Sequence, residues 1–188
     1  MQDKLDVMDA LSTSLRRGSG LDEAVTVHGK FIAELVRNER VIWHDEGLNV
    51  VTTVGKNVAL DGYLASGYSL VGPYMGLIGA STTGPVVGDT MASHGGWSEA
   101  GNANTPTYTS PRKTCAWNAA SAGSKSLSAA LSFAITGTGT VNGAFIVFGT
   151  GALTTIDNTA GTLYSAGTFT GRSVLSGDTL NVSYTASL

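Results

Sequence analysis

Alternating apolar and polar positions run through most of this chain and predict β-strands. Residues 25–37 give the clearest example, because one side of the segment is apolar while the other carries mostly polar groups. The apolar side consists of Val25, Val27, Phe31, Ala33 and Leu35. Asn38-Glu39-Arg40 follows and predicts a short turn into a second strand over residues 41–44, so these two strands are expected to form a hairpin.

Further strands are predicted at short intervals along the rest of the chain. They cover residues 49–54, 74–78, 113–118, 127–135, 141–148, 163–169 and 180–184. The run 141–148 is almost continuously apolar, which is typical of a central strand. Glycine-rich turns separate the strands, and strands do not alternate with helices. The pattern therefore predicts an all-β fold, an antiparallel β-sandwich or jelly roll.

Two segments show helical spacing instead. In residues 3–17 an apolar stripe recurs every three or four positions, with acidic residues in the first turn and basic residues in the last. The stripe consists of Leu5, Met8, Leu11 and Leu15. Gly18-Ser19-Gly20 ends the segment and supplies a flexible joint. A second, short helix is predicted near residues 56–64, with Leu60 and Leu64 on one face.

This pattern predicts an N-terminal helical arm, residues 1–20, followed by a β-sandwich domain, residues 21–188. A helix as short as residues 3–17 is marginal alone in water, so its stripe must pack against something. The candidates are the chain's own β body, a sister subunit and a different protein. We expect the four stripe residues Leu5, Met8, Leu11 and Leu15 to be partner-binding.

Composition and charge narrow the function classes. Of the 188 residues, 13% are charged, the formal net charge is −3, and most charged residues fall within 1–61. Lys and Arg do not cluster, so nucleic-acid binding is not expected. No apolar run approaches the about 20 residues that span a bilayer, and no signal peptide is predicted. The single Cys115 excludes an internal disulfide and a multi-cysteine zinc site.

Candidate catalytic residues are few. Asp89, Ser93 and His94 supply the residue types of a nucleophilic triad, but an adjacent Ser and His rarely aim at each other and no nucleophile-elbow motif is present. A loop held by Asp and His hydrogen bonds and a packed Trp97 explains this segment better. His28 and His44 could face each other across the hairpin, although two surface histidines are the simpler interpretation. We therefore predict no catalytic, cofactor-binding or metal-binding residues, and no enzyme.

Several segments carry a resemblance to a known group. They are Lys30–Glu34, Val41–Glu46, Asn49–Asn57, Tyr74–Gly79, Gly88–Glu99, Gly143–Phe145 and Ser176–Val182. Together they resemble small structural proteins of tailed bacteriophages, of the capsid decoration, cement or head-fibre type, over roughly residues 25–188. The most specific part runs from Asp89 to Trp97, whereas residues 1–20 lie outside the shared pattern.

The resemblance implies a virion protein on the capsid exterior, assembled in the host cytoplasm. Its implied partners are the major capsid protein and further copies of itself, with no nucleic acid and no membrane. Met91, His94 and Trp97, from the most specific segment, are the implied partner-binding loop. Two alternatives stay open: a tail or fibre component, and a carbohydrate-binding sandwich that stacks sugars on Trp97, Tyr108 and Trp117. For those aromatic residues, core or interface packing is the preferred interpretation.

Overall fold

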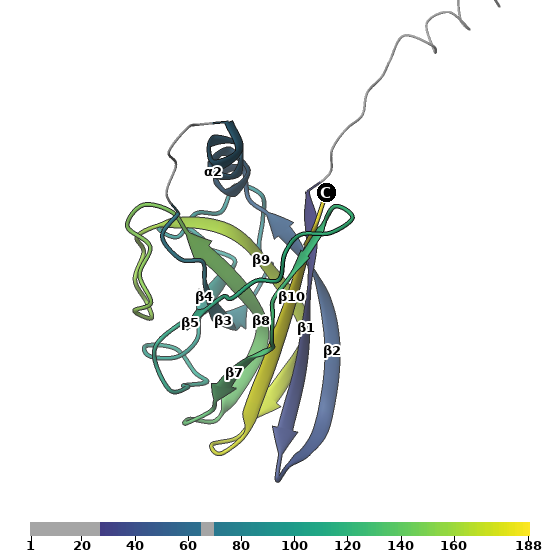
Figure 1. Cartoon of the computed structure of the whole chain (residues 1–188). Coiled ribbons are helices and arrows are strands. Elements are labelled where there is room, and N and C mark those ends of the chain that lie inside the picture. Colours follow the sequence, from purple (N-terminus) through teal and green to yellow (C-terminus); the bar gives the residue numbers. More distant parts are fainter. Residues whose placement is uncertain (1–26, 65–69) are drawn as a thin grey trace, which may run out of the picture.

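The computed structural model describes residues 27–64 and 70–188 and shows a mostly antiparallel β-sheet protein with one short helix among them (Figure 1). The predicted all-β, sandwich-like fold class is therefore confirmed. The strands are β1 (His28–Arg37), β2 (Arg40–Val51), β3 (Tyr74–Ser81), β4 (Trp97–Glu99), β5 (Lys113–Thr114), β6 (Ser124–Ser126), β7 (Leu131–Ala134), β8 (Gly139–Phe148), β9 (Thr162–Val174) and β10 (Thr179–Ser187), and the helix is α2 (Thr53–Leu64). The predicted arm, its Gly-Ser-Gly joint and the domain boundary at residue 20 lie outside the described residues.

One continuous sheet folds over to make two layers. Its strand order is β4-β3-β8-β9-β2-β1-β10-β6, with β5 added to β3 and β7 to β10. The first part of β2 pairs with β1, and its last three residues pair with β9. We call β2, β1, β10, β6 and β7 the first sheet, and β2, β9, β8, β3, β4 and β5 the second sheet. Strand β2 thus belongs to both layers, which face each other in Figure 1.

The predicted hairpin forms between β1 and β2. Asn38 and Glu39 occupy the two-residue turn with positive φ angles of 49° and 62°. Such a turn matches the right-handed twist of the paired strands. The predicted apolar side of β1 faces the core, since Phe31, Ala33 and Leu35 have no exposed surface.

The predicted strands 41–44 and 49–54 form the single strand β2, which ends at Val51. In the segment between them, His44, Glu46 and Leu48 are all exposed, and the apolar Leu48 on this exposed side breaks the alternation that marks a strand. Gly47 allows the crossing between sheets, since a Cβ atom there would collide with the backbone of Thr168 on β9. Glycine at this position lets β2 leave β1 and reach the second sheet without a break.

Two clusters of buried side chains hold the layers together. The first lies between the sheets and draws on both, with Phe31 from β1, Leu180 from β10, and Met75 and Ile146 from the second sheet. The second cluster covers the opposite face of the second sheet. It contains Ile78, Met91, Trp97, Phe145, Val147, Ala152, Leu163 and Ala166. Strand β8 is therefore buried on both faces, as its continuous apolar run predicts.

The predicted strand 127–135 is interrupted. The structure places β6 before it and β7 within it, and both pair with β10. Ser126 pairs with Thr185 and Leu131 pairs with Val182, so the chain between them contains more residues than the facing stretch of β10. The extra residues bulge out, while Leu127 and Phe133 still reach the core. The predicted strand 113–118 is likewise shorter, with only Lys113 and Thr114 in β5.

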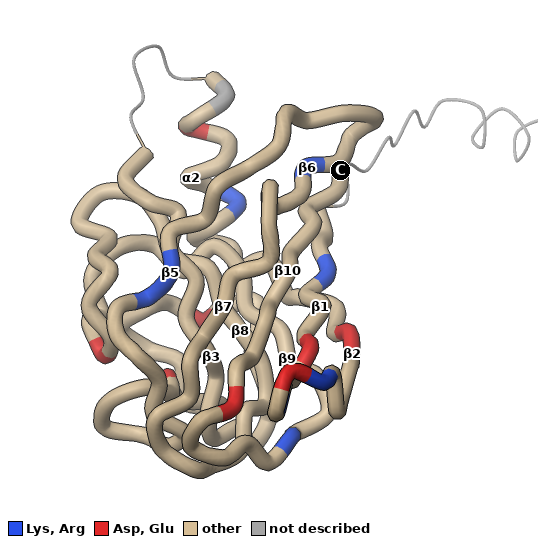
Figure 2. Tube along the Cα trace, turned by 60° about the horizontal axis from the view of Figure 1, so that its bottom comes forward, with Lys and Arg blue, Asp and Glu red and all other residues tan. Residues whose placement is uncertain are grey.

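Charged residues gather around the β1–β2 hairpin, whereas the middle of the body is largely uncharged (Figure 2). Lys30 pairs with Glu46 across the hairpin at 2.6 Å. Arg37 donates two hydrogen bonds of 2.7 and 2.6 Å to the carboxylate of Asp178 in the β9–β10 turn. Both pairs include a basic residue of β1, whereas α2 itself carries Lys56 and Asp61.

Candidate functional site

Helix α2 is fixed on the end of the second sheet by its first turn. Thr52 caps the helix, because its Oγ1 accepts a hydrogen bond of 3.0 Å from the backbone N–H of Gly55. The same hydroxyl donates to the carbonyl of Leu163. Gly55 rests directly on β9, where a Cβ atom would come within 2.5 Å of the Tyr164 carbonyl oxygen. The helix therefore starts one turn before the predicted Lys56 and cannot shift without losing this cap.

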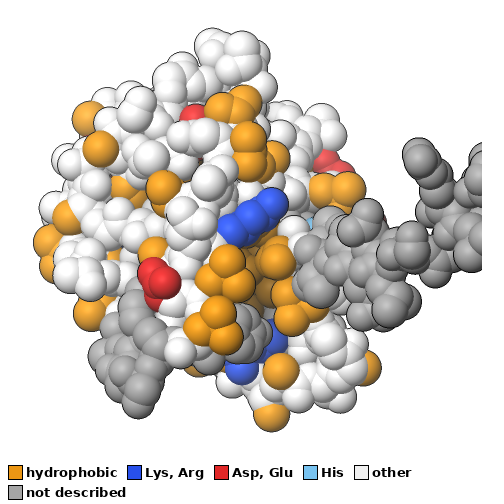
Figure 3. Space-filling view, turned by 90° about the horizontal axis from the view of Figure 1, so that it is seen from above, with side chains coloured by type: hydrophobic (Ala, Val, Ile, Leu, Met, Phe, Trp, Pro, Cys, Tyr) orange, Lys and Arg blue, Asp and Glu red, His pale blue; other side chains and the backbone are white. Residues whose placement is uncertain are grey.

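An apolar groove lies beside α2. It has a cavity volume of about 440 Å³ and runs between the helix, the beginning of β1 and the end of β10. Its lining residues are Val27, Val51, Lys56, Ala59, Leu60, Tyr164 and Leu188. A second hollow of about 200 Å³ shares Val27, Tyr164 and Leu188 with it and continues along Gly123 to Lys125. Figure 3 shows the hollow from above, surrounded by hydrophobic side chains with basic ones at its margin.

The surface near this groove is unusually apolar. Leu60 is 56% exposed, Leu64 84% and Leu188 59%. Leu60 and Leu64 form the helix face that the sequence predicts, but that face is turned largely to solvent. A helix normally buries its apolar stripe, so this exposed face is a candidate binding surface.

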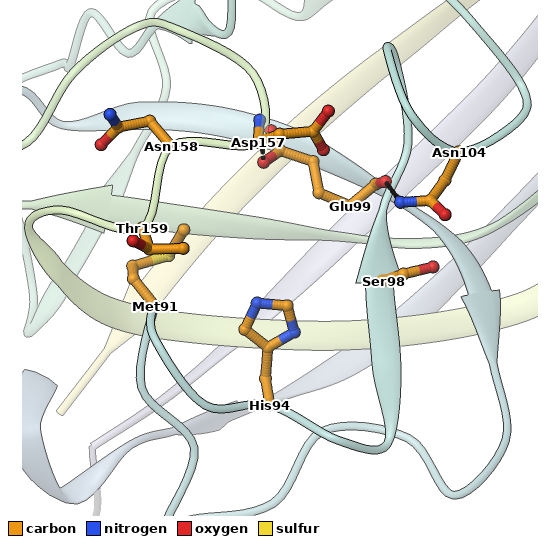
Figure 4. A pocket seen from close by; sticks show the side chains of 8 residues that line it. All are labelled: Met91, His94, Ser98, Glu99, Asn104, Asp157, Asn158 and Thr159. Atoms are coloured by element: carbon orange, nitrogen blue, oxygen red, sulfur yellow. Dashed lines mark hydrogen bonds between the residues drawn. The ribbon is translucent and has the colours of Figure 1, made fainter.

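The second candidate site is a small polar cavity of about 170 Å³ under the long loop that leads to β5 (Figure 4). It is lined by Met91, His94, Ser98, Glu99, Asn104, Asp157, Asn158 and Thr159. The loop after β8 contributes the residues from Asp157 to Thr159, and β4 contributes Ser98 and Glu99. The cavity thus joins two irregular segments that are far apart in the sequence.

Glu99, in the wall of this cavity, forms a buried ion pair with Arg112. Arg112 is 1% exposed and Glu99 is 5% exposed, and the guanidinium donates two hydrogen bonds of 2.8 and 2.6 Å to the carboxylate. Arg112 also donates to the carbonyls of Leu153 and Asn158, and the backbone N–H of Asp157 donates to Glu99. Burial raises the pKa of Glu99, while the hydrogen bonds from Arg112 oppose that rise.

Several groups of the polar cavity are held by hydrogen bonds within the chain. Both carboxylate oxygens of Glu99 already accept hydrogen bonds. His94 Nδ1 lies 3.0 Å from the Trp97 carbonyl oxygen, and the His94 ring stacks on the Trp97 indole with centroids 3.9 Å apart. Figure 4 shows the Ser98 side chain pointing away from His94. His94 Nδ1 faces a carbonyl oxygen, to which it can only donate, and both Glu99 oxygens are held by Arg112 and by the backbone of Asp157.

The nucleophilic triad is not assembled. The Asp89 carboxylate accepts hydrogen bonds from Trp97 Nε1 at 2.9 Å and from the backbone N–H of Val86 at 3.0 Å. His94 contacts the Trp97 carbonyl instead of Asp89. The interpretation of this segment as a loop held by Asp and His hydrogen bonds around a packed Trp is therefore confirmed.

The predicted partner-binding residues divide into two groups. Leu5, Met8, Leu11 and Leu15 lie outside the described residues. Met91 and Trp97 are 2% and 5% exposed and belong to the second core cluster, which leaves His94 as the only partly exposed member of the loop set. Their role in partner binding stays a prediction, but two of the three side chains already pack within this chain.

Aromatic residues do not form a sugar-stacking platform. Trp97 and Tyr108 are both buried, and Trp117 packs edge-on against Tyr184 at the first core cluster. His28 and His44 do not face each other across the hairpin. His44 lies opposite Glu34, with 3.2 Å between His44 Nδ1 and Glu34 Oε1. His28 pairs with Ser187 on β10.

Sequence patterns did not reveal the groove or the Arg112–Glu99 pair. Lining residues of the groove come from five separate places in the chain, so no local spacing marks it. Glu99 ends the three-residue strand β4 and Arg112 lies in the loop before β5, and neither strand nor helix spacing in the sequence predicts that their side chains meet. The exposed Leu60 and Leu64 were the one sequence signal for the groove.

Fold and sites together define a β-sandwich-like protein with a small cavity lined by polar residues and a larger apolar groove. Comparison with protein families, curated proteins and solved structures finds no match to this chain. Within residues 27–64 and 70–188, no helix is long and apolar enough to cross a membrane. Across the same residues, His, Cys, Asp and Glu do not gather into a group that could hold a metal ion.

Proposed function

We propose that this protein is a structural subunit of a tailed-bacteriophage particle that binds the outside of the capsid and cements neighbouring major capsid subunits. Residues 1–20 serve as the docking arm, and the β body is the rigid part between contacts. The resemblance of residues 25–188 to phage structural proteins supports this assignment. The hydrogen bonds that Arg112 and the backbone of Asp157 donate to Glu99 support a structural role for this residue over a catalytic one.

One observation carries the proposal: the apolar end of the body is also the end at which the arm joins it. Val27 lines the groove, and Leu60, Leu64 and Leu188 stand exposed near it. The Leu/Met stripe of the arm and this surface together supply apolar area for contact with coat subunits. Burial of apolar area stabilises association by about 25 cal/mol per Å² before the costs of ordering are subtracted.

Repetition over the shell strengthens weak single contacts. If each copy also touches its neighbours, the second contact forms at high effective concentration and the combined affinity exceeds either alone. Contacts made mainly by apolar groups are also insensitive to ionic strength, in contrast to contacts between exposed charges. We therefore expect capsid binding to persist at high salt.

Binding to purified capsids that lack this protein tests the proposal. Leu11→Asp places a charge on the stripe and is expected to weaken docking by about tenfold or more, since a buried leucine contributes about 1.5–3 kcal/mol. Thr13→Asp adds the same charge on the opposite side of the predicted helix and serves as the matched control. Co-sedimentation measures the affinity, and particle imaging gives the position of the bound protein.

Deletion of residues 1–20 is expected to abolish docking and leave the β body folded. Retained docking would reject the arm as the contact. Density on the tail in place of the shell would support the fibre alternative, and the absence of this protein from assembled particles would reject both.

A further inference from the structure

The groove beside α2 has the size and chemistry of a seat for one face of an amphipathic helix. Its about 440 Å³ is lined almost entirely by apolar side chains, with Lys56 the charged exception. Helix-in-groove recognition uses side chains at spacings of three and four along one helix face, inserted into such a groove. The predicted stripe of residues 3–17 has this spacing.

We propose that in the free protein the Leu/Met stripe of residues 3–17 occupies the α2 groove of its own chain. The position of the chain supports this choice, because Val27, the first described residue, is itself part of the groove wall. The arm therefore connects to the body at the site that it would fill.

The connecting segment is long enough for the arm to fold back. Residues 18–26 span at most about 30 Å when extended, and Gly18-Ser19-Gly20 permits a reversal of direction. A helix over residues 3–17 is about 22 Å long, so its whole stripe stays within reach of the groove. A linker that spans the sites without strain gives the highest effective concentration.

Tethering decides between the chain's own arm and that of a second copy. A short flexible linker holds its end at an effective concentration in the millimolar range, whereas a second copy must reach that concentration in solution. At micromolar protein, the chain's own arm therefore fills the groove. This inference goes beyond the proposed function and concerns the protein without its particle.

Cross-linking in the full-length protein tests it. Met8→Cys and Leu60→Cys place one thiol on the stripe and one at the groove, and a short bismaleimide reports their proximity. The native Cys115 stays out of the reaction, because it is 5% exposed and burial raises its pKa to about 12. Val41→Cys replaces Leu60→Cys in the matched control, since Val41 is equally exposed but lies at the opposite end of β1.

We expect a bridged monomer as the main product, with a yield independent of protein concentration and about tenfold above the Val41 control. Adding Leu11→Asp is expected to lower that yield about tenfold, while Thr13→Asp leaves it unchanged. Cross-linked dimers that increase with protein concentration would overturn the proposal in favour of a second copy. A yield equal to the Val41 control would overturn it outright. Either result would leave the proposed capsid binding open, because co-sedimentation with capsids tests that binding independently.

Discussion

The polar cavity and the α2 groove differ in how completely the chain covers its own surface. Around the cavity, Arg112, Glu99, Asp89 and Trp97 are buried, and each makes a hydrogen bond within the chain. Beside α2, apolar side chains such as Leu60 stand exposed around a hollow. The contrast teaches that the loop segment identified as most specific in the sequence packs within the body, whereas the less distinctive helix leaves apolar side chains exposed.

Removal of the buried arginine tests the structural side of this comparison most strongly. Arg112→Met leaves Glu99 buried without its partner, and breaking a buried ion pair in this way costs about 3–5 kcal/mol. We expect that loss in the free energy of unfolding, measured with urea at pH 7. Lys113→Met is the control, because Lys113 is adjacent in sequence but its ammonium is exposed. Equal losses in the two variants would show that the cavity does not hold the loops together.

A smaller loss is expected at the loop tryptophan. Trp97→Phe keeps an aromatic ring in the second core cluster but removes the Nε1 donor, so the buried Asp89 carboxylate loses one of its hydrogen bonds. A hydrogen bond to a charged group contributes about 1.5–3 kcal/mol. Trp43→Phe, on a half-buried tryptophan that packs against Phe169, is expected to cost less. If Trp97→Phe is neutral for stability but lowers capsid binding, the loop is an interaction site and the comparison fails.

The ion pair between Arg37 and Asp178 sharpens the comparison, because its arginine is partly exposed. Asp178→Asn removes the bidentate contact and is expected to cost about 1–2 kcal/mol at pH 7, less than Arg112→Met. Hydrogen bonds from Arg37 lower the pKa of Asp178 below its ordinary value. Its contribution is therefore complete above the ordinary carboxyl pKa of about 3.9 and decreases as the pH falls through the lower folded value.

Unfolding measured between pH 7 and pH 2 checks this sign. The stability difference between the original protein and Asp178→Asn is expected to shrink as acid protonates Asp178. A difference that grows toward low pH would contradict the assignment.

The smallest effect on stability is expected at the groove. Leu60→Asp changes a position that the β body itself leaves exposed, so in the protein without residues 1–20 it is expected to alter the free energy of unfolding by less than about 0.5 kcal/mol. Ala33→Asp, at a fully buried position of β1, is the contrasting variant and should unfold the body. A large loss in Leu60→Asp would place this leucine in the structural core and remove the distinction between the two regions.

Much of the fold follows from local patterns in the sequence. The alternation around Phe31 predicts β1 and its buried face, and the continuous apolar run predicts a β8 that is buried on both sides. Between Leu127 and Ile135, apolar and polar residues continue to alternate through a bulge. The sequence therefore predicts correctly which side chains face the core, but it does not predict that the pairing with β10 is interrupted. The sequence predicts two strands in place of β2. The reason is that the region around Gly47, where β2 crosses between the sheets, has solvent on one side and the β9 backbone on the other, so it needs no buried apolar residues.

The candidate sites are less predictable because they depend on contacts between distant segments. The groove brings Val27 and Leu188 together with the α2 residues, and Glu99 in the cavity wall binds Arg112 and the backbone of Asp157. Only the Trp97 loop gave a correct local prediction, since its Asp89 and His94 partners lie within eight residues of the indole.

Pairing of β1 with β10 has a consequence for biosynthesis. His28 to Val36 pair with Thr179 to Ser187, so β1 acquires this neighbour only after more than 140 further residues have been synthesised (179 − 36 = 143). Contacts this far apart in sequence form late and slow folding. A nascent chain stopped before Thr179 exposes an unsatisfied β1 edge to other polypeptides, which makes interrupted synthesis the stage at which this protein is most vulnerable to aggregation.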